Sequence, residues 1–165
     1  SIQAVYVPAD DFTDPAAAHI FSHLSASVVL SRKRASEGLY PALDPLASAS
    51  VMLTPSVVGQ RHYDIARAVR RTLAEYEELR DIIAMLGLEE LSSNDRATVA
   101  RARRLERFLT QPFFTTGSFS GMEGKRVSIA ETLEGCETIL EKTQFDLPES
   151  AYYMIGGLGD LETAS

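Results

Sequence analysis

The longest hydrophobic pattern in the chain has the period of an α-helix. Large apolar residues recur every three or four positions from Ile65 to Ile83, with charged residues between them. Gly87 follows the pattern, and glycine is favoured directly after a helix. We therefore predict one amphipathic helix of about 25 residues that ends at Gly87.

Two further helices follow, and each begins at a capping signal. Ser92 with Asp95, and Ser128 with Glu131, fit the capping box, in which a hydroxyl and a carboxylate satisfy free backbone donors. The first of these helices runs to Pro112 and has four apolar residues on one face: Val99, Ala102, Leu105 and Leu109. The second runs through Leu133 and Ile139. Helices with short connections predict a small antiparallel bundle.

Residues 1 to about 55 have a different pattern of short apolar runs between polar turns. Ile2–Val7 and Ala26–Leu30 are rich in strand-forming residues and predict two strands, the second buried. Thr13–Pro15 predicts a short helix between them, through Ala18 to Phe21. This order resembles one unit of a parallel α/β sheet. Because two strands do not make a stable sheet, we expect the remaining strands upstream, and a start without Met, inside a strand, suggests a cut chain.

The composition is that of an ordinary soluble globular protein. Hydrophobic residues make up 45% of the 165-residue chain and charged residues 24%. A net charge of −7 disfavours nucleic-acid binding, which usually requires a basic face. A single cysteine, Cys136, excludes an internal disulfide, and no apolar run reaches the ~20 residues that span a bilayer.

Several short motifs fail on inspection. Gly121–Arg126 lacks the first glycine and the Ser or Thr of a phosphate loop, and Gly117–Gly121 has Phe119 where a nucleophile elbow has Ser. His19 and His23 have no obvious third zinc ligand, so no metal site is predicted. Three acids near the start of the chain suit turns and caps better than a divalent ion: Asp10, Asp11 and Asp14.

A run of basic residues on the second predicted helix has a simple interpretation. Arg101, Arg103, Arg104 and Arg107 have no interleaved aromatic residues of the kind that bind nucleic acid. We predict that they form a solvated face near the acidic turn at Glu89 and Glu90.

Seven segments match one known pattern in order and without insertions, over residues 1 to about 157. They are Ala4–Asp11 with Thr13–Pro15, Val29–Arg32, Gly38–Pro45, His62–Arg67, Leu79–Ala84, Ala100–Arg104 and Arg107–Phe113. Together they resemble the beta-subunit family of F-type ATP synthases. The ungapped order is far more specific than any single motif.

The resemblance implies a fold and a division of the chain. Residues 1–58 resemble the end of a P-loop-type α/β nucleotide-binding domain, and residues 59–165 resemble a carboxy-terminal helical domain. The expected fold is mostly α, an α/β remnant followed by an antiparallel helical bundle. In the family the phosphate loop, the magnesium-binding acid and the catalytic glutamate lie upstream, so no catalytic residue is expected in this chain. ATP or ADP with Mg²⁺ is the cofactor of the full subunit, and this chain alone should bind none tightly.

The resemblance also implies an adenine site. Tyr40, in the Gly-x-Tyr-Pro motif, matches a tyrosine that stacks on adenine, and Phe113 and Phe119 match two phenylalanines that complete the pocket. Thr116 stands where the family usually has Ala. The larger, polar side chain of Thr116 would narrow the pocket edge or let water into it. Core packing is the alternative for these rings, and it explains Phe113 as well as the pocket does.

Two stretches resemble contacts with a rotating central stalk. Asp11, Thr13 and Asp14 match a loop that catches the stalk, and Glu89–Asp95 matches an acidic lever. Within the lever, Glu89, Glu90 and Asp95 keep the family's acids, whereas Ser93 and Asn94 have replaced two. Ordinary turn and cap chemistry would explain both stretches equally well.

The implied partners are alpha subunits in an alternating hexamer, and gamma and epsilon subunits of the central stalk. The complex would lie on the cytoplasmic face of a bacterial inner membrane, or on the matrix or stromal face of an organelle membrane. It would touch the membrane through a sector that moves protons or sodium ions. Two alternatives stay open: a related secretion or flagellar export ATPase, and a non-catalytic helical interaction module.

Overall fold

The computed structural model describes residues 1–7, 13 and 15–163 of the chain. The described elements, in order, are α1 (Pro15–Phe21), β1 (Ala26–Ser27), α2 (Arg32–Ser36), β2 (Ala49–Ser50), α3 (Pro55–Val58), α4 (Gln60–Leu86), a 3₁₀ turn (Leu88–Glu90), α5 (Ser93–Phe108), α6 (Gly117–Ser120), α7 (Ile129–Glu141), a second 3₁₀ turn (Glu149–Tyr152) and α8 (Gly159–Thr163). The fold is mostly helical, as the sequence predicts.

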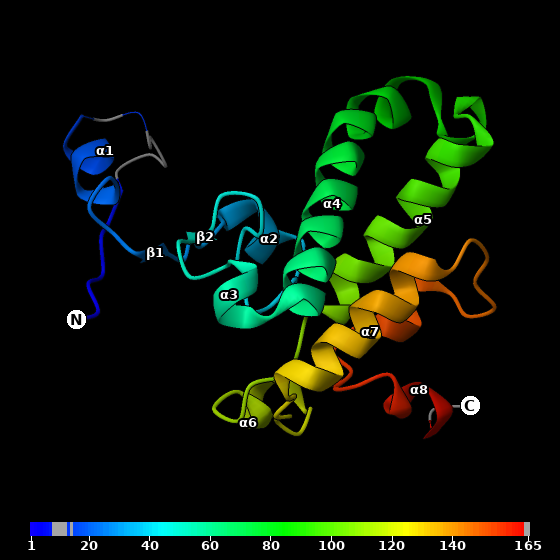
Figure 1. The fold of residues 1–165 in the computed structure, drawn as a ribbon. Coiled ribbons are helices and arrows are strands. Elements are labelled where there is room, and N and C mark those ends of the chain that lie inside the picture. Colours follow the sequence, from blue (N-terminus) through cyan, green and yellow to red (C-terminus); the bar gives the residue numbers. More distant parts are fainter. Residues whose placement is uncertain (8–12, 14, 164–165) are drawn as a thin grey trace.

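The core lies where α4, α5 and α7 pack together (Figure 1). Its most deeply buried large side chains are Leu73 on α4, Val99 and Leu105 on α5, and Ile139 on α7. The predicted long helix is confirmed as α4, which has 27 residues and ends at Gly87 with φ 90°. A positive φ of this size is accessible to glycine at low cost, so Gly87 stops the helix and turns the chain toward α5.

Both predicted capping signals are confirmed at the starts of α5 and α7. The Ser92 hydroxyl accepts a hydrogen bond from the Asp95 amide. At α7 the box is complete, because the Ser128 hydroxyl accepts from the Glu131 amide while the Glu131 carboxylate accepts from the Ser128 amide. These bonds satisfy backbone donors that the first helical turn leaves free.

The two predicted strands are wrong in extent. Residues 1–7 form no regular element, and β1 contains only Ala26 and Ser27. β1 pairs antiparallel with β2, rather than parallel with an earlier strand. Val28 and Leu30, predicted to be buried, are 71% and 72% exposed. The physical reason is that a strand requires neighbours on its edges, and the described residues supply β1 with one short partner.

Leu109 was also expected in the core and is 36% exposed. The helix α5 ends at Phe108, so Leu109 is already its C-cap and has left the helical face. Phe108 occupies the core position instead, at 4% exposure. The helical period predicted the correct face of α5. Because the helix ends early, the last buried residue of that face is Phe108 and not Leu109.

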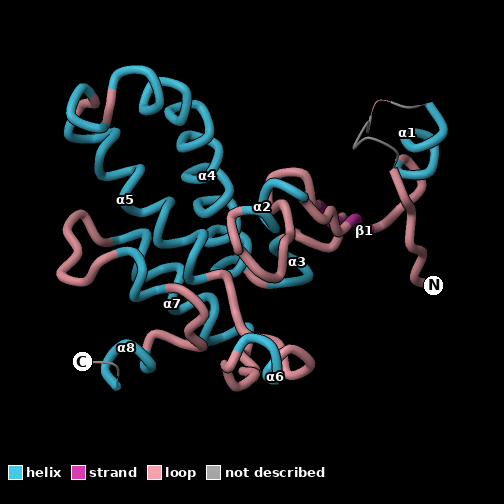
Figure 2. Tube along the Cα trace, turned by 180° about the vertical axis from the view of Figure 1, so that it is seen from behind, coloured by secondary structure: helices cyan, strands magenta, loops and turns pink. Residues whose placement is uncertain are grey.

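Residues 31–48 lie against the helical domain, whereas α1 lies away from it (Figure 2). Arg70 on α4 donates hydrogen bonds to three carbonyl oxygens of this segment, those of Pro45, Leu46 and Ser48, at 2.6–3.0 Å. From the chain directly after the second 3₁₀ turn, the Tyr153 hydroxyl donates to the Gly38 carbonyl at 2.7 Å. These contacts cross the predicted boundary between residues 58 and 59, which itself stays a prediction.

Candidate functional site

Tyr40 lies in the turn between α2 and β2, and its backbone is joined to the chain that follows α5. The Gln111 amide donates to the Tyr40 carbonyl at 3.0 Å, across 71 positions of sequence. The Tyr40 side chain is 41% exposed, and its hydroxyl lies 3.4 Å from the Ala35 carbonyl. The fold therefore fixes the Tyr40 backbone beside the start of the segment that contains Phe113 and Phe119.

Residues 112–125 form a closed loop, which we call the aromatic loop. Its base is joined by a hydrogen bond from the Lys125 amide to the Pro112 carbonyl, at 3.2 Å. Near the base the backbone of Gly124 lies directly against Phe114, where a Cβ on Gly124 would be 2.5 Å from the Phe114 Cα atom. Glycine is required at 124 because any side chain would collide with the opposite side of the loop.

The predicted adenine-binding residues all lie on this loop or beside it. Phe113 is half-buried, and its carbonyl accepts from the Thr116 hydroxyl at 3.2 Å. Phe119 lies on α6 and is 92% exposed. Among the described residues, no aromatic ring packs against Phe119 or Tyr40. The structure brings the Tyr40 backbone to the base of the loop, and it leaves the predicted pairing of the two rings across a base as a prediction.

The described residues of the predicted stalk contact lie in two places that are far apart, before α1 and at the tip of the α4–α5 hairpin (Figure 1). Glu89 and Glu90 are exposed on the 3₁₀ turn between α4 and α5. Asp95 is half-buried, and its carboxylate accepts from the Ser92 hydroxyl at 2.8 Å, so it acts in the cap. Thr13 is exposed before α1, whereas Asp11 and Asp14 lie outside the described residues.

Sequence analysis missed the apolar residues at the tip of the α4–α5 hairpin. Met85 and Leu86 are 74% and 64% exposed at the end of α4, and Leu88 in the turn is 36% exposed. The helical period places Met85 and Leu86 beyond the core stripe, which is the signal that could have identified them. Exposed apolar residues that cluster at one end of a molecule are typical of a protein contact.

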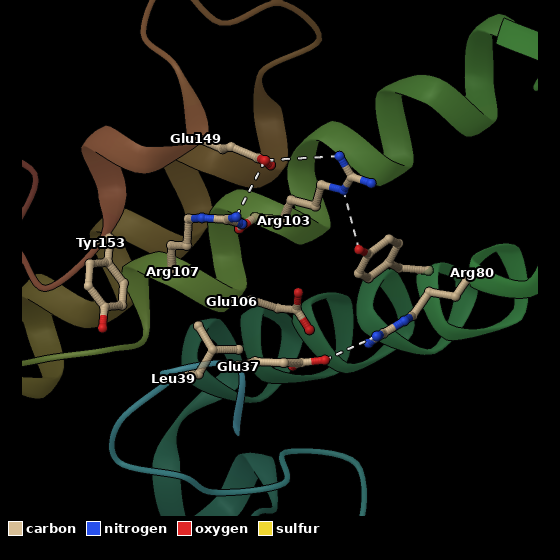
Figure 3. Close-up of a pocket in the computed structure, with 9 residues that line it drawn as sticks. Glu37, Leu39, Arg80, Arg103, Glu106, Arg107, Glu149 and Tyr153 are labelled. Atoms are coloured by element: carbon tan, nitrogen blue, oxygen red, sulfur yellow. Dashed lines mark hydrogen bonds and ion pairs between the residues drawn. The ribbon is translucent and has the colours of Figure 1, made fainter. Parts of the chain in front are cut away.

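A cavity of about 480 Å³ lies between α4, α5 and the turn after α2 (Figure 3). Its charged lining balances three arginines against three glutamates. Arg80 pairs with Glu37 at 3.0 Å, and Glu149 lies 3.4 Å from Arg107 and 3.9 Å from Arg103. The third glutamate, Glu106, pairs with Arg34 from α2.

The Arg34–Glu106 pair is nearly removed from solvent, with side chains 9% and 8% exposed. Burial raises the pKa of the Glu106 carboxyl, although the guanidinium of Arg34 opposes that rise. The pair joins α2 to α5 across 72 positions of sequence. It stabilises the position of the segment that ends in Tyr40.

The prediction of a solvated arginine face on α5 is wrong in part. Arg104 lies over the ring of Phe145, 4.0 Å from its centroid, and donates to the Leu147 carbonyl at 2.9 Å. Arg103 donates to the Tyr76 hydroxyl at 3.3 Å. The chain after α7 folds back over α5, so that Phe145 and the Leu147 carbonyl cover Arg104. The hydroxyl that accepts from Arg103 belongs instead to Tyr76 on α4.

Within the described part of the chain, no three His, Cys, Asp or Glu side chains are placed to hold a metal ion. None of the described helices is long and apolar enough to cross a membrane. Burial raises the pKa of the Cys136 thiol to about 12, so it remains protonated and unreactive.

Two family models divide the chain between them. Residues 52–151 match the C-terminal domain of V and A type ATP synthase, and residues 1–50 match the nucleotide-binding domain of the ATP synthase alpha/beta family. The chain belongs to the ATP synthase family of the first match, which covers more than half of it. The family boundary near residue 51 falls close to β2, before the long helix α4 begins.

Relatives in the ATP synthase family are similar along nearly the whole chain. The chain is 84% identical to ATP synthase subunit beta 1 of Dinoroseobacter shibae, over 98% of this chain and 35% of the relative. It is 82% identical to ATP synthase subunit beta 2 of Nitrosomonas eutropha, over 99% of this chain and 34% of the relative. The chain thus spans about one third of the length of these relatives.

Solved structures of ATP synthase subunits and related ATPases share the fold. The ATP synthase subunit NeqB of Nanoarcheaum equitans is 26% identical with a TM-score of 0.69, over 86% of this chain and 35% of that one. EscN of an enteropathogenic E. coli secretion system is 22% identical with a TM-score of 0.64, over 82% of this chain and 31% of that one, which shows the fold alone. The sequence identities favour the synthase over the export ATPase that the sequence left open.

Proposed function

We propose that this chain is part of a catalytic beta subunit of a rotary ATP synthase, and that it supplies the adenine contact and a stalk lever. The full subunit would synthesise or hydrolyse ATP with Mg²⁺, coupled to stalk rotation and to movement of protons or sodium ions. The phosphate-binding and magnesium-binding residues are expected outside this chain.

One observation supports the adenine site above the others. The hydrogen bond from the Gln111 amide to the Tyr40 carbonyl, at 3.0 Å, joins the tyrosine turn to the residue directly before the aromatic loop. Tyr40 and Phe119 keep large exposed faces, 41% and 92%, on which an adenine can stack. A flat base gains roughly 1–3 kcal/mol from such stacking, and Phe113 and Thr116 would line the inner edge of the pocket.

The helical hairpin supplies the mechanical part of the proposal. Nucleotide binding between the two domains would close the helical domain, and the α4–α5 tip would then press on the stalk. The tip combines Glu89 and Glu90 with exposed Met85 and Leu86, so it can make polar and apolar contacts. Asp95 would act through the cap that stiffens α5. Thr13, with Asp11 and Asp14 beside it in sequence, would form the second stalk contact.

The partners follow from this role. Alpha subunits would alternate with this subunit in a hexamer, and gamma and epsilon subunits would form the stalk. The assembly would lie at the cytoplasmic face of a bacterial inner membrane, or the matrix or stromal face of an organelle membrane, and touch the bilayer only through its ion-translocating sector.

Substitution of the two stacking rings tests the adenine site in the full-length subunit within its assembled complex. We expect Tyr40→Ala and Phe119→Ala each to raise the KM for ATP about tenfold, since a tenfold change corresponds to about 1.4 kcal/mol of lost stacking. Phe114→Ala is the matched control, because this ring belongs to the same loop and is 71% exposed, but it lies against Gly124 and has no contact with adenine in the proposal. Unchanged nucleotide affinity in both ring variants would overturn the assignment.

A second test uses the 165-residue chain alone. It lacks a phosphate loop, so we expect no ATP hydrolysis above background and no tight binding of ATP. Measurable, saturable ATPase activity in the purified chain would contradict the proposed division of labour.

A further inference from the structure

The C-terminal segment makes a side-chain contact with the base of the aromatic loop. Lys125, the last residue of that loop, pairs with Asp160 on α8, with 2.5 Å between the Nζ and Oδ2 atoms. The same Oδ2 atom accepts a hydrogen bond from the Gly156 amide at 2.8 Å. We call this arrangement of Lys125, Gly156 and Asp160 the tail clip.

The tail clip is closely packed around Gly156. A Cβ on that buried glycine would lie 3.0 Å from the Asp160 carboxylate and 3.3 Å from the Lys125 Cδ atom. The absence of a side chain at 156 therefore lets the lysine and the aspartate meet. The pairing also holds the pKa of the Asp160 carboxyl below its usual range, chiefly through the hydrogen bond from Lys125.

The tail clip lies at the base of the aromatic loop, where it can affect the orientation of the whole loop. The described hydrogen bonds of residues 113–122 stay within the loop. They involve Phe113, Thr116, Gly117 and Ser120. The loop is joined to the helical domain and the tail at its base, where Pro112 and Lys125 meet and Lys125 reaches Asp160. Since Phe119 itself is 92% exposed, its position depends on how firmly the base is held.

We propose that Asp160, through the tail clip, is a positioning residue that orients the aromatic loop for binding of the adenine base. This inference rests on the proposed adenine site, and extends it to a segment to which that proposal gives no role. Asp160 touches no nucleotide in this scheme. It acts by fixing Lys125, and thereby the end of the loop that presents Phe119.

The test replaces Asp160 by Asn in the full-length subunit within its assembled complex. Asn keeps an oxygen that can accept from the Gly156 amide, so the variant removes the charge of the pair alone. We expect the KM for ATP to rise about threefold at unchanged kcat, because a half-exposed ion pair contributes little energy but sets geometry. Asp160→Glu should return the KM to the wild-type value.

Two further variants make the test specific. Gly156→Ala should raise the KM in the same way, because the added Cβ separates the lysine from the aspartate. Glu137→Gln is the matched control: it removes a similarly exposed ion pair, with Arg61, that joins α4 to α7 and leaves the loop untouched. We expect the control to keep the wild-type KM.

A second readout does not depend on nucleotide. Hydrogen exchange of the amides of residues 113–123 should be faster in Asp160→Asn than in wild type, with the exchange of α4 and α5 unchanged. Faster loop exchange with an unchanged KM would overturn the positioning role, and so would unchanged exchange. If the ring variants Tyr40→Ala and Phe119→Ala raise the KM and Asp160→Asn does not, this inference fails alone. If none of the three variants raises the KM, the adenine site fails as well.

Discussion

At the scale of single residues, the Arg34–Glu106 pair is the contact whose loss should matter most. Its two side chains are 9% and 8% exposed, so removal of one partner leaves a buried charge without compensation. Such losses typically cost about 3–5 kcal/mol, whereas replacement of both partners by apolar residues is often much milder. The two single variants should also differ from each other, because one of the two charges can be neutralised by a proton and the other cannot.

We predict that Arg34→Leu destabilises the chain by about 3 kcal/mol at about pH 8, and by clearly less at about pH 5. Burial already raises the pKa of Glu106, and loss of Arg34 raises it further. A carboxyl whose pKa is higher in the folded state than in the unfolded state favours folding at low pH, and this benefit disappears as pH rises through the folded pKa. Urea unfolding at the two pH values measures the difference.

The reciprocal variant provides the control. Glu106→Leu leaves the Arg34 guanidinium, which keeps its charge over this range, so its destabilisation should not shrink on acidification. The double variant Arg34→Leu with Glu106→Leu should be more stable than either single variant at about pH 8. A pH-independent loss in Arg34→Leu would show that Glu106 does not take up the proton.

The Arg34–Glu106 pair could not be predicted from the sequence, whereas much of the helical core could. The helical period identified Leu73, Val99 and Ile139 as core residues because burial on one face is a local property of a helix. Arg34 and Glu106 are 72 positions apart, and nothing in either neighbourhood marks them as partners. Arg104 was misassigned for the same reason, because the ring of Phe145 that covers it comes from a later segment.

At the scale of elements, the sequence predicted helix ends well because caps are local chemistry. Gly87 ends α4, and Ser92 and Ser128 cap the starts of α5 and α7. Each does so through hydrogen bonds to residues a few positions away. The strand at residues 2–7 failed because β-structure depends on neighbours that local sequence does not specify. Within the candidate site, Tyr40 and Phe119 were suggested by resemblance, whereas the contact of Lys125 with Asp160 had no signal in either neighbourhood.

Packing between α5 and α7 gives a prediction that opposes helix propensity. Gly135 lies in the middle of α7, where replacement by Ala would ordinarily gain about 1 kcal/mol. A Cβ at this position would overlap the ring of Phe108, at 2.0 Å from its Cζ atom, and that ring is buried in the core at 4% exposure. We predict that Gly135→Ala destabilises the chain by about 1–2 kcal/mol in urea unfolding, since overpacking exceeds the gain in propensity.

The matched control is a second glycine in a helix. Gly159 begins α8, and a Cβ there would meet nothing within 4 Å. Gly159→Ala should therefore be neutral or slightly stabilising. Equal effects of the two substitutions would show that close contact with Phe108 does not limit the approach of α7 to α5.

At the scale of the whole molecule, the chain combines a helical domain with a segment from the preceding domain that is attached to it. Residues 31–48 belong to the part that matches the nucleotide-binding domain. They are held to the helical domain by the Arg34–Glu106 pair, by Arg70 and by the Tyr153 hydroxyl. Tyr40 lies within this segment, so movement of the helical domain would be transmitted to the residue proposed to stack on adenine.

Arg70 offers the sharpest test of that attachment. Its guanidinium donates to the carbonyl oxygens of Pro45, Leu46 and Ser48, and no other described side chain bonds to these three oxygens. We predict that Arg70→Met accelerates hydrogen exchange in residues 43–48 roughly tenfold, which corresponds to about 1.4 kcal/mol of lost local stability. The bundle should keep its protection, because Met still covers the apolar surface beside α4. Arg71→Met removes a neighbouring exposed arginine whose ion pair among the described residues, with Glu75, lies within α4, and it should leave the exchange of residues 43–48 as in wild type. Equal exchange in the two variants would mean that residues 31–48 are held to the helical domain by other contacts, and Arg70 would then have no part in coupling Tyr40 to the lever.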